Sequence, residues 1–198
     1  MGDDKVRCPW ALQDPLYIQY HDQEWGTPER DELKVFQHLC LEVFQFGLSW
    51  LLILKRRPFL MRALLDFEPM RLAEMDEEGV MAALQMPMMI RSPAKVLGVV
   101  NNARALLRMW DRGLSLSDQV WSAVGGVPIV SRRSIREPLP PSTEESRALS
   151  RRLKSLGFVF TGPVVCYSLM QAVGAVDDHG VECFRHSFNR NGGVGHGA

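Results

Sequence analysis

Apolar residues recur at spacings of three and four along most of the chain, which is the pattern of amphipathic helices. The clearest stretch is residues 31–46, where the expected buried face carries Leu33, Phe36, Leu39, Cys40, Val43 and Phe44. Val35 and Leu41 fall off that face. No stretch alternates apolar and polar residues over enough positions to predict a β-strand. The pattern therefore predicts an all-α protein.

Proline and a capping residue place the next two helices. A helix is expected over residues 49–65, with Pro58 near an end or at a kink, because proline lacks the N–H that a helix interior needs. Asp76 is a typical N-cap residue, and it predicts a helix over residues 77–86.

Further cap signals follow in the second half. Ser92 followed by Pro93 predicts the start of a helix that Gly113 ends. Ser142 and Glu145 have the spacing of a capping box. The remaining helices are expected over residues 143–156, 162–175 and 178–186.

Two segments lack a helical pattern. Two glycines and four prolines between residues 125 and 141 predict a long irregular crossing. Residues 187–198 include four glycines and few apolar groups, and we expect this tail to be disordered. A single helical domain over residues 1–186 is the simplest organisation.

The charge balance limits what can be said of partners. Lys plus Arg number 23 and Asp plus Glu number 23, so the net charge is zero. Proteins that bind DNA strongly usually carry a basic excess, because phosphate contacts release counterions. Any contact with DNA must therefore come from a local patch.

The chain has no segment typical of export or membrane insertion. Residues 1–7 contain two aspartates and no apolar signal core, and no apolar run approaches the roughly 18 residues of a membrane span. Four cysteines in such a chain favour reduced thiols or metal ligands over disulfides. We expect a cytoplasmic monomer.

One carboxylate has unusual neighbours. Glu42 lies among Leu41, Val43, Phe44 and Phe46, which are typical core residues. Burying a carboxylate lowers the stability of the fold by roughly several kcal/mol unless the group is paired, hydrogen-bonded or protonated. Such carboxylates often bind or react with a ligand. The alternative is a glutamate on the solvent side of an amphipathic helix, and spacing alone leaves both open.

Several sequence blocks together resemble the bacterial 3-methyladenine DNA glycosylase I family. The blocks occur in order over nearly the whole chain. They are Arg7-Cys8-Pro9-Trp10, Gln13-Asp14-Pro15-Leu16-Tyr17, Tyr20-His21-Asp22-Gln23-Glu24-Trp25-Gly26, Gly47-Leu48-Ser49-Trp50, Gly157-Phe158-Val159-Phe160 and Cys166-Tyr167-Ser168-Leu169-Met170-Gln171-Ala172. The resemblance implies a helix-hairpin-helix DNA glycosylase fold, with two helical lobes and a base pocket between them.

The resemblance also implies roles for individual residues. Trp50 should stack on a flipped base while Glu42 and Tyr20, the expected catalytic pair, hydrogen-bond its edge. The other side chains expected around the base are Trp10, Tyr17, Trp25 and Phe46. Without the resemblance, any one of these aromatic residues is more simply interpreted as part of the core.

The implied reaction is hydrolytic removal of N3-methyladenine from double-stranded DNA, without a lyase step. An N3-methylated adenine is cationic, so its glycosidic bond is already weakened. We expect Glu42 and Trp50 to favour the cationic base, and water to attack the sugar. The rival hypothesis is a family member that binds alkylated DNA or free base without turnover.

A metal site is also implied. His179 and Cys183 lie four residues apart, and on the expected last helix they would share a face. By itself this pair is a weak signal. The resemblance adds Cys8 and His21, which completes the two-cysteine, two-histidine set of one structural zinc ion. This Zn²⁺ would join the two ends of the chain.

The expected DNA contacts are less secure because the chain departs from the family. Met88 stands where the family has a glycine that would turn backbone N–H groups toward a phosphate. Arg91 and Lys95 still lie near a helix N-terminus, which suits an anion. Val43 and Phe46 are also larger than the family's usual residues, and Phe46 is expected either to narrow the pocket or to add a stacking face.

Overall fold

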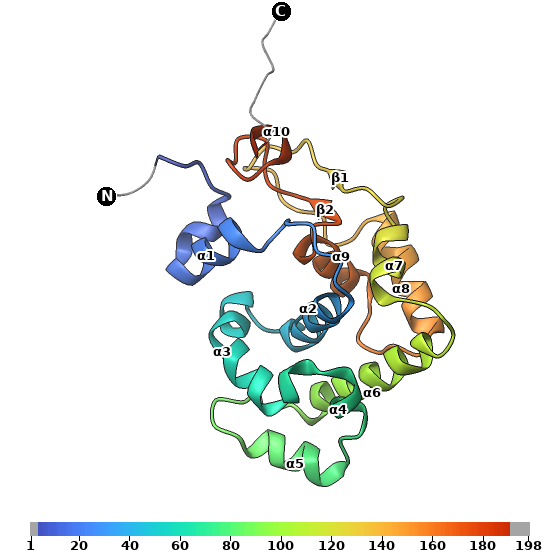
Figure 1. Ribbon diagram of the computed structural model, residues 1–198. Helices are drawn as coiled ribbons and strands as arrows, with labels where there is room; N and C mark the ends of the chain where they lie inside the picture. The colour runs from blue at the N-terminus through green and yellow to red at the C-terminus, as the bar shows by residue number, and fades with distance from the viewer. Residues whose placement is uncertain (1–3, 191–198) are drawn as a thin grey trace, which may run out of the picture.

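The computed structural model describes residues 4–190, which are mostly helical (Figure 1). The elements are the 3-10 helix η1 (Pro9–Gln13), α1 (Pro15–Gln23), α2 (Glu32–Gln45), α3 (Trp50–Ala63), the 3-10 turn η2 (Leu65–Phe67), α4 (Pro69–Ala73), α5 (Glu77–Gln85), α6 (Pro93–Trp110), α7 (Leu116–Ser122), β1 (Ile129–Val130), α8 (Glu144–Ser155), α9 (Pro163–Ala172), β2 (Val176–Asp177) and α10 (Ser187–Arg190).

Helix α2 forms the centre of the structure. The Asp31 side chain accepts a hydrogen bond from the N–H of Lys34 and so caps the first turn. From there α2 packs against α3, α6, α7 and α9, and it lies between α3–α6 and α9 in Figure 1. The expected helix over residues 31–46 is confirmed. Because Glu42 lies on this central helix, it can reach a cavity only from within the core.

Helices α3 to α6 form the lower part of Figure 1. Ser49 caps α3 and Asp76 caps α5 through their side chains, which confirms both expected starts. Pro58 lies inside α3 and not near an end, which leaves a kink as the remaining alternative of the prediction. Ile53 and Leu60, on either side of it, are fully buried, and their packing holds the helix across the missing N–H.

Two cap predictions in the second half need correction. The capping box of α8 is formed by Thr143 and Ser146, one residue beyond the expected pair. Pro93 does begin α6, but the side chain of Ser92 makes no cap hydrogen bond. Gly157 follows α8 with a φ of +89°, as expected of a glycine after a helix.

The C-terminal segment differs most from the sequence prediction. Residues 178–186 form turns and not a helix, and residues 187–190, expected to be disordered, form α10. Residues 191–198 lie outside the described part. Strands β1 and β2 pair in parallel, with Ile129 opposite Val176. Each strand has only two residues, which is too short for a detectable alternation.

The two ends of the described chain meet. The N–H of Phe184 donates to the carbonyl of Val6 at 2.9 Å. His186 is fully buried, with Nε2 2.8 Å from the carbonyl oxygen of Ser131. These contacts fix the segments before α1 and after β2 against each other.

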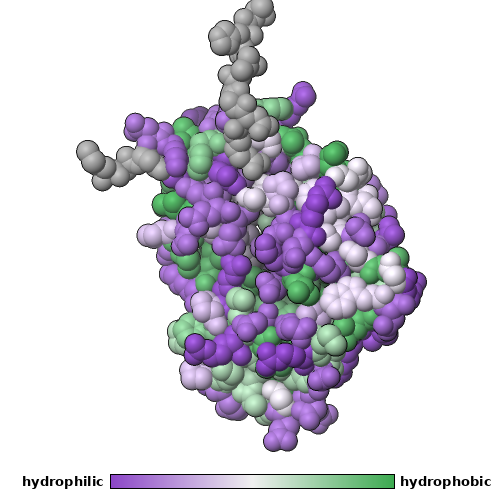
Figure 2. Space-filling model, viewed as in Figure 1, coloured by the Kyte–Doolittle hydropathy of each residue, from purple (hydrophilic) through white to green (hydrophobic). Residues whose placement is uncertain are grey.

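The face shown in Figure 2 is largely hydrophilic, with scattered apolar areas. Within residues 4–190, no helix is both long and apolar enough to cross a membrane.

Candidate functional site

A cavity of about 330 Å³ opens between the N-terminal helices, the central helix and α9. Aromatic and polar side chains share its wall. The lining residues are Trp10, Tyr17, Tyr20, Trp25, Glu42, Gln45, Trp50, Leu139, Ser168 and Gln171. A small, mostly aromatic cavity with a few polar groups is the usual form of a small-molecule site.

The aromatic rings hold one another in place. Trp10 meets Tyr17 and Trp25 edge to face, with ring centroids 5.5 and 5.1 Å apart. Tyr20 and Trp50 lie 5.3 Å apart at an interplanar angle of 52°. Such pairs add about 0.5–1.5 kcal/mol each beyond burial. The cavity is therefore rigid before any ligand enters.

Tyr17 also fixes the position of Trp50. Its hydroxyl accepts a hydrogen bond from the N–H of Leu51 at 2.9 Å. Leu51 is in the first turn of α3, where backbone N–H groups lack helical partners. This bond joins α1 to the start of α3 and holds Trp50 against the cavity.

Glu42 lies at the bottom of the cavity without a partner. It is 3% exposed, and burial raises its pKa from 4.5 to about 8. Neither Glu42 Oε2 nor the indole Nε1 of Trp50 has a hydrogen-bond partner among the described residues. An unpaired buried polar group costs about 1–3 kcal/mol. Both groups are thus available to a polar ligand, and the buried alternative for Glu42 is the correct one.

Tyr20 is the second polar group beside Glu42. It is 4% exposed, and burial, with a smaller effect from the charge of Glu42, raises its pKa well above 10. Tyr20 therefore keeps its proton and can donate a hydrogen bond into the cavity.

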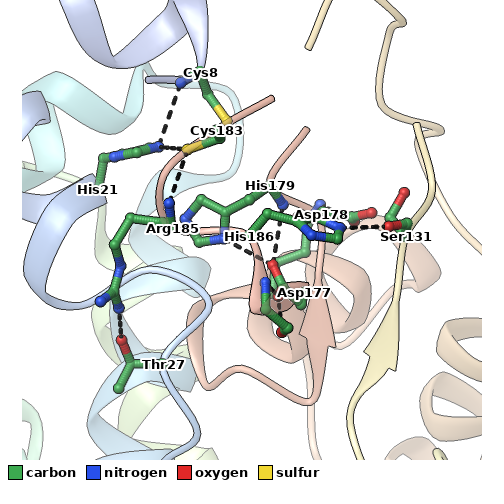
Figure 3. Close-up of polar contacts among 12 residues, drawn as sticks. Cys8, His21, Thr27, Ser131, Asp177, Asp178, His179, Cys183, Arg185 and His186 are labelled. Atoms are coloured by element: carbon green, nitrogen blue, oxygen red, sulfur yellow. Dashed lines mark hydrogen bonds and ion pairs between the residues drawn. The ribbon is translucent and has the colours of Figure 1, made fainter. Parts of the chain in front are cut away.

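A second cluster lies next to the cavity. The metal-binding atoms of Cys8, His21 and Cys183 all lie within 4.8 Å of one another, and all three residues are buried. His21 Nε2 is 3.4 Å from Cys183 Sγ (Figure 3). His21 Nδ1 contacts Asp22 at 2.8 Å. This group could hold a metal ion, as the sequence predicted for these three residues.

The thiols of the cluster share a proton. The hydrogen bond from Cys8 lowers the pKa of Cys183, and the same bond raises the pKa of Cys8. A thiolate is the form that binds a metal ion.

His179 lies beside this group but outside the set of mutually close atoms. Its ring meets that of His21 edge to face at 4.9 Å. His179 Nδ1 contacts Asp177 at 2.8 Å, and its buried Nε2 has no partner among the residues described. His179 and Cys183 reach the cluster from turns after β2 and not from a helix. The expected helical pairing was wrong, although both residues do approach the cluster.

Comparison with known proteins identifies the family. The model of the methyladenine glycosylase family matches residues 10–186. The chain belongs to this family.

The relatives of this methyladenine glycosylase are similar over almost their whole length. DNA-3-methyladenine glycosylase 1 of Escherichia coli K12 is 45% identical over 184 residues, which cover 93% of this chain and 98% of the relative. DNA-3-methyladenine glycosylase of Haemophilus influenzae is 44% identical, with coverages of 90% and 96%.

Solved structures agree with this assignment, and the mostly helical fold of the chain matches theirs. A crystal structure of 3-methyladenine DNA glycosylase I is 46% identical, with a TM-score of 0.88 and coverages of 91% and 100%. The structure described as the basis of 3-methyladenine recognition by the Staphylococcus aureus enzyme is 33% identical, with a TM-score of 0.84 and coverages of 89% and 94%.

Two residues expected at the site lie elsewhere. Phe46 is 60% exposed and does not line the cavity. It lies beside Phe160 in a separate apolar groove, with ring centroids 6.4 Å apart, because α2 ends at Gln45 and the chain turns outward. Lys95 is buried, and its ammonium donates to the carbonyls of Phe44 and Phe46 at 2.7 and 2.6 Å. It closes the end of α2 and is not free for a phosphate.

The hairpin before α6 retains its turn despite Met88. This residue has a φ of +64°, a value that favours glycine. Its carbonyl and its sulfur accept hydrogen bonds from Arg56 at 3.1 and 2.8 Å. Arg91 is exposed beside the turn.

Sequence reasoning missed four lining residues. Gln45 is three residues beyond Glu42 on the same helix face, so spacing could have indicated it. Ser168 and Gln171 stand at the same spacing on α9, inside a block that carried the resemblance. Leu139 comes from the irregular crossing, where no periodicity exists to indicate it.

Proposed function

We propose that this methyladenine glycosylase removes 3-methyladenine from double-stranded DNA by hydrolysis of the N-glycosidic bond. The observation that carries the proposal is the unpaired, buried carboxyl of Glu42 in an aromatic cavity. The relatives that are 44–45% identical over most of the chain are named for this activity. Binding without turnover is therefore not the favoured alternative.

In the proposed complex, the base leaves the DNA stack and enters the cavity. Trp50 stacks on it, and Trp10, Tyr17 and Trp25 enclose it. Stacking on an aromatic side chain contributes about 1–3 kcal/mol per base. Glu42 accepts a hydrogen bond from the base edge, and the neutral hydroxyl of Tyr20 lies beside it.

The charge of the substrate defines the chemistry. Methylation at N3 leaves a base that is cationic while still joined to the sugar, so no strong acid has to protonate it. Entry of a cation lowers the pKa of Glu42 and favours its carboxylate form. Glu42 thus recognises and stabilises charge, and water attacks the sugar. None of the residues found to line the cavity is a lysine, as expected for hydrolysis without a Schiff base.

The cluster of Cys8, His21 and Cys183 fits a structural zinc ion, with His179 as the fourth ligand. Ligands about 2.0–2.3 Å from one zinc ion lie roughly 3.3–3.8 Å apart, and His21 and Cys183 are 3.4 Å apart. The contact of His179 Nδ1 with Asp177 leaves Nε2 for a metal, an arrangement common among zinc-binding histidines. An ion here would hold α1, and with it Tyr20, in place.

Of Arg91 and Lys95, only Arg91 is proposed to contact the DNA backbone, because the ammonium of Lys95 is bound to the carbonyls of Phe44 and Phe46. We also propose that the protein acts on DNA as a cytoplasmic monomer.

Release of free 3-methyladenine from methylated duplex DNA tests the proposal. The wild type should release the base, and Glu42→Gln should release it far more slowly. A folded, metal-loaded wild type that shifts methylated DNA in a gel but releases no base would instead establish binding without turnover.

A further inference from the structure

Gln171 is a cavity residue whose amide has a fixed orientation. It lies in the last turn of α9, is 7% exposed and lines the cavity. Its Nε2 donates to Asp178 Oδ2 at 2.7 Å. No other described residue is recorded as a partner of its side chain. The hydrogen bond to Asp178 therefore determines where the amide oxygen of Gln171 points.

Asp178 can accept only one orientation of that amide. It is 6% exposed, and it also accepts hydrogen bonds from the guanidinium of Arg133 and the hydroxyl of Tyr167. A carboxylate paired with a guanidinium has acceptors only. Gln171 must turn its NH₂ group toward Asp178, and this leaves Oε1 for the cavity.

Three segments of the chain hold this arrangement. Tyr167 and Gln171 come from α9, Asp178 follows β2, and Arg133 belongs to the irregular crossing that also brings Leu139 to the cavity. The carboxylate of Asp178 accepts from three donors, and a buried polar group with several partners is held in a fixed position. Rotation of the Gln171 amide would place its NH₂ group away from Asp178 and break the 2.7 Å bond.

We infer that Gln171, positioned by Asp178, selects bases that carry an exocyclic amino group over bases that carry a carbonyl at that position. Glu42 and Gln171 Oε1 then offer two acceptors to the two hydrogens of one amino group. 3-Methyladenine has this amino group, whereas 3-methylguanine has a carbonyl oxygen at position 6. The carbonyl oxygen of 3-methylguanine would face the oxygens of Glu42 and Gln171, and none of these acceptors would then have a donor. The inference rests on the proposed function in that it concerns the same cavity.

Binding of the free bases tests the inference apart from catalysis. Calorimetry of the wild type above pH 8, where the carboxyl of Glu42 is ionised, with 3-methyladenine and with 3-methylguanine gives the ratio of the two dissociation constants. We expect the wild type to prefer 3-methyladenine by about tenfold or more. Gln171→Leu should remove most of that preference. A wild type that binds 3-methyladenine yet releases none from DNA would contradict the proposed function and leave this inference standing.

Two further variants distinguish selection from a merely structural role. Asp178→Asn lets the amide of Gln171 rotate, so the preference should fall, and it should fall no further when combined with Gln171→Leu. Gln45→Leu is the matched control, because no carboxylate is recorded as holding the Gln45 amide, which can rotate to suit either base. It should change both affinities alike.

The melting temperature and metal content of each variant show whether it is folded. Equal affinities of the wild type for both bases would overturn the inference. So would an unchanged preference in folded Gln171→Leu. If Asp178→Asn does not fold, Gln171→Leu alone decides the matter.

Discussion

Lowering the pH should inactivate the enzyme through Glu42. Burial raises the pKa of this carboxyl to about 8 in the unliganded cavity, so the group is ionised above that pH and protonated below it. A protonated Glu42 offers no charge to a cationic base. The methylated base keeps its positive charge at every pH, since it arises from alkylation and not from a proton.

The size of the effect follows from the ionised fraction. With a pKa of about 8, about half of the free enzyme carries the carboxylate at pH 8, and about 1% carries it at pH 6. The value of kcat/KM reports groups of the free enzyme, so it should fall about 50-fold between these two pH values. Tyr20 stays neutral throughout, because its pKa lies well above 10.

The assay is release of 3-methyladenine from methylated duplex DNA at several pH values and constant ionic strength, with spontaneous release subtracted. Glu42→Gln is the control, and its residual activity should be nearly independent of pH. Wild-type kcat/KM that stays constant from pH 8 to pH 6 would refute the reasoning. So would the same slope in Glu42→Gln, because another group would then be titrating.

Four further measurements follow from the same contacts. Glu42→Gln should stabilise the unliganded protein by up to about 5 kcal/mol above pH 8 and by little below pH 4.5. Between pH 4.5 and about 8 the carboxyl of Glu42 loses its proton in the unfolded chain but keeps it in the folded protein. Urea unfolding of both proteins above pH 8 and below pH 4.5 measures the difference. Met88→Val should lower stability by about 1–2 kcal/mol, whereas Met88→Gly should not, because the φ of +64° suits glycine; a stable Met88→Val would contradict the strain. Lys95→Leu should lower the free energy of unfolding by about 1–3 kcal/mol, because two carbonyls lose their partner. It should leave the salt dependence of DNA binding unchanged. Arg91→Ala should instead reduce the slope of log affinity against log salt by about one. Zinc analysis should find one ion per chain and none in Cys183→Ser, and a chelator should lower the melting temperature of the wild type only.

The sequence predicted α2, α3 and α5 because local signals specify them, but it predicted no helix for α1 or α4. Asp76 caps α5 as expected. The apolar spacing placed most of the buried face of α2 correctly, but Leu33 of that face is 45% exposed, and Val35 and Leu41, which fall off it, are buried. The segment around His179 was predicted wrongly as a helix. Its conformation depends on the pairing of β2 with β1 and on contacts with the N-terminal segment, and such distant contacts leave no periodicity in the sequence.

The residues of the cavity likewise divide into those that the sequence indicated and those that depend on distant contacts. The resemblance pointed to Glu42 and to the aromatic residues on α1 and α3. It could not show that Phe46 faces outward or that Lys95 is buried, since both depend on how α2 ends against α6. Gln171 stood in a recognised block, but its role follows from Asp178, which reaches it only through the folded turn after β2.

The metal-binding cluster and the cavity are joined at two adjacent pairs of residues. Tyr20 lines the cavity and His21 belongs to the cluster, on the same turn of α1. Asp178 holds Gln171 at the cavity, and His179 follows it directly beside the cluster. A shift of either segment at the cluster therefore moves a group that faces the base. An ion bound far from the reacting bond would still act on recognition, by fixing α1, which carries Tyr20, and the turn after β2, which positions Gln171 through Asp178.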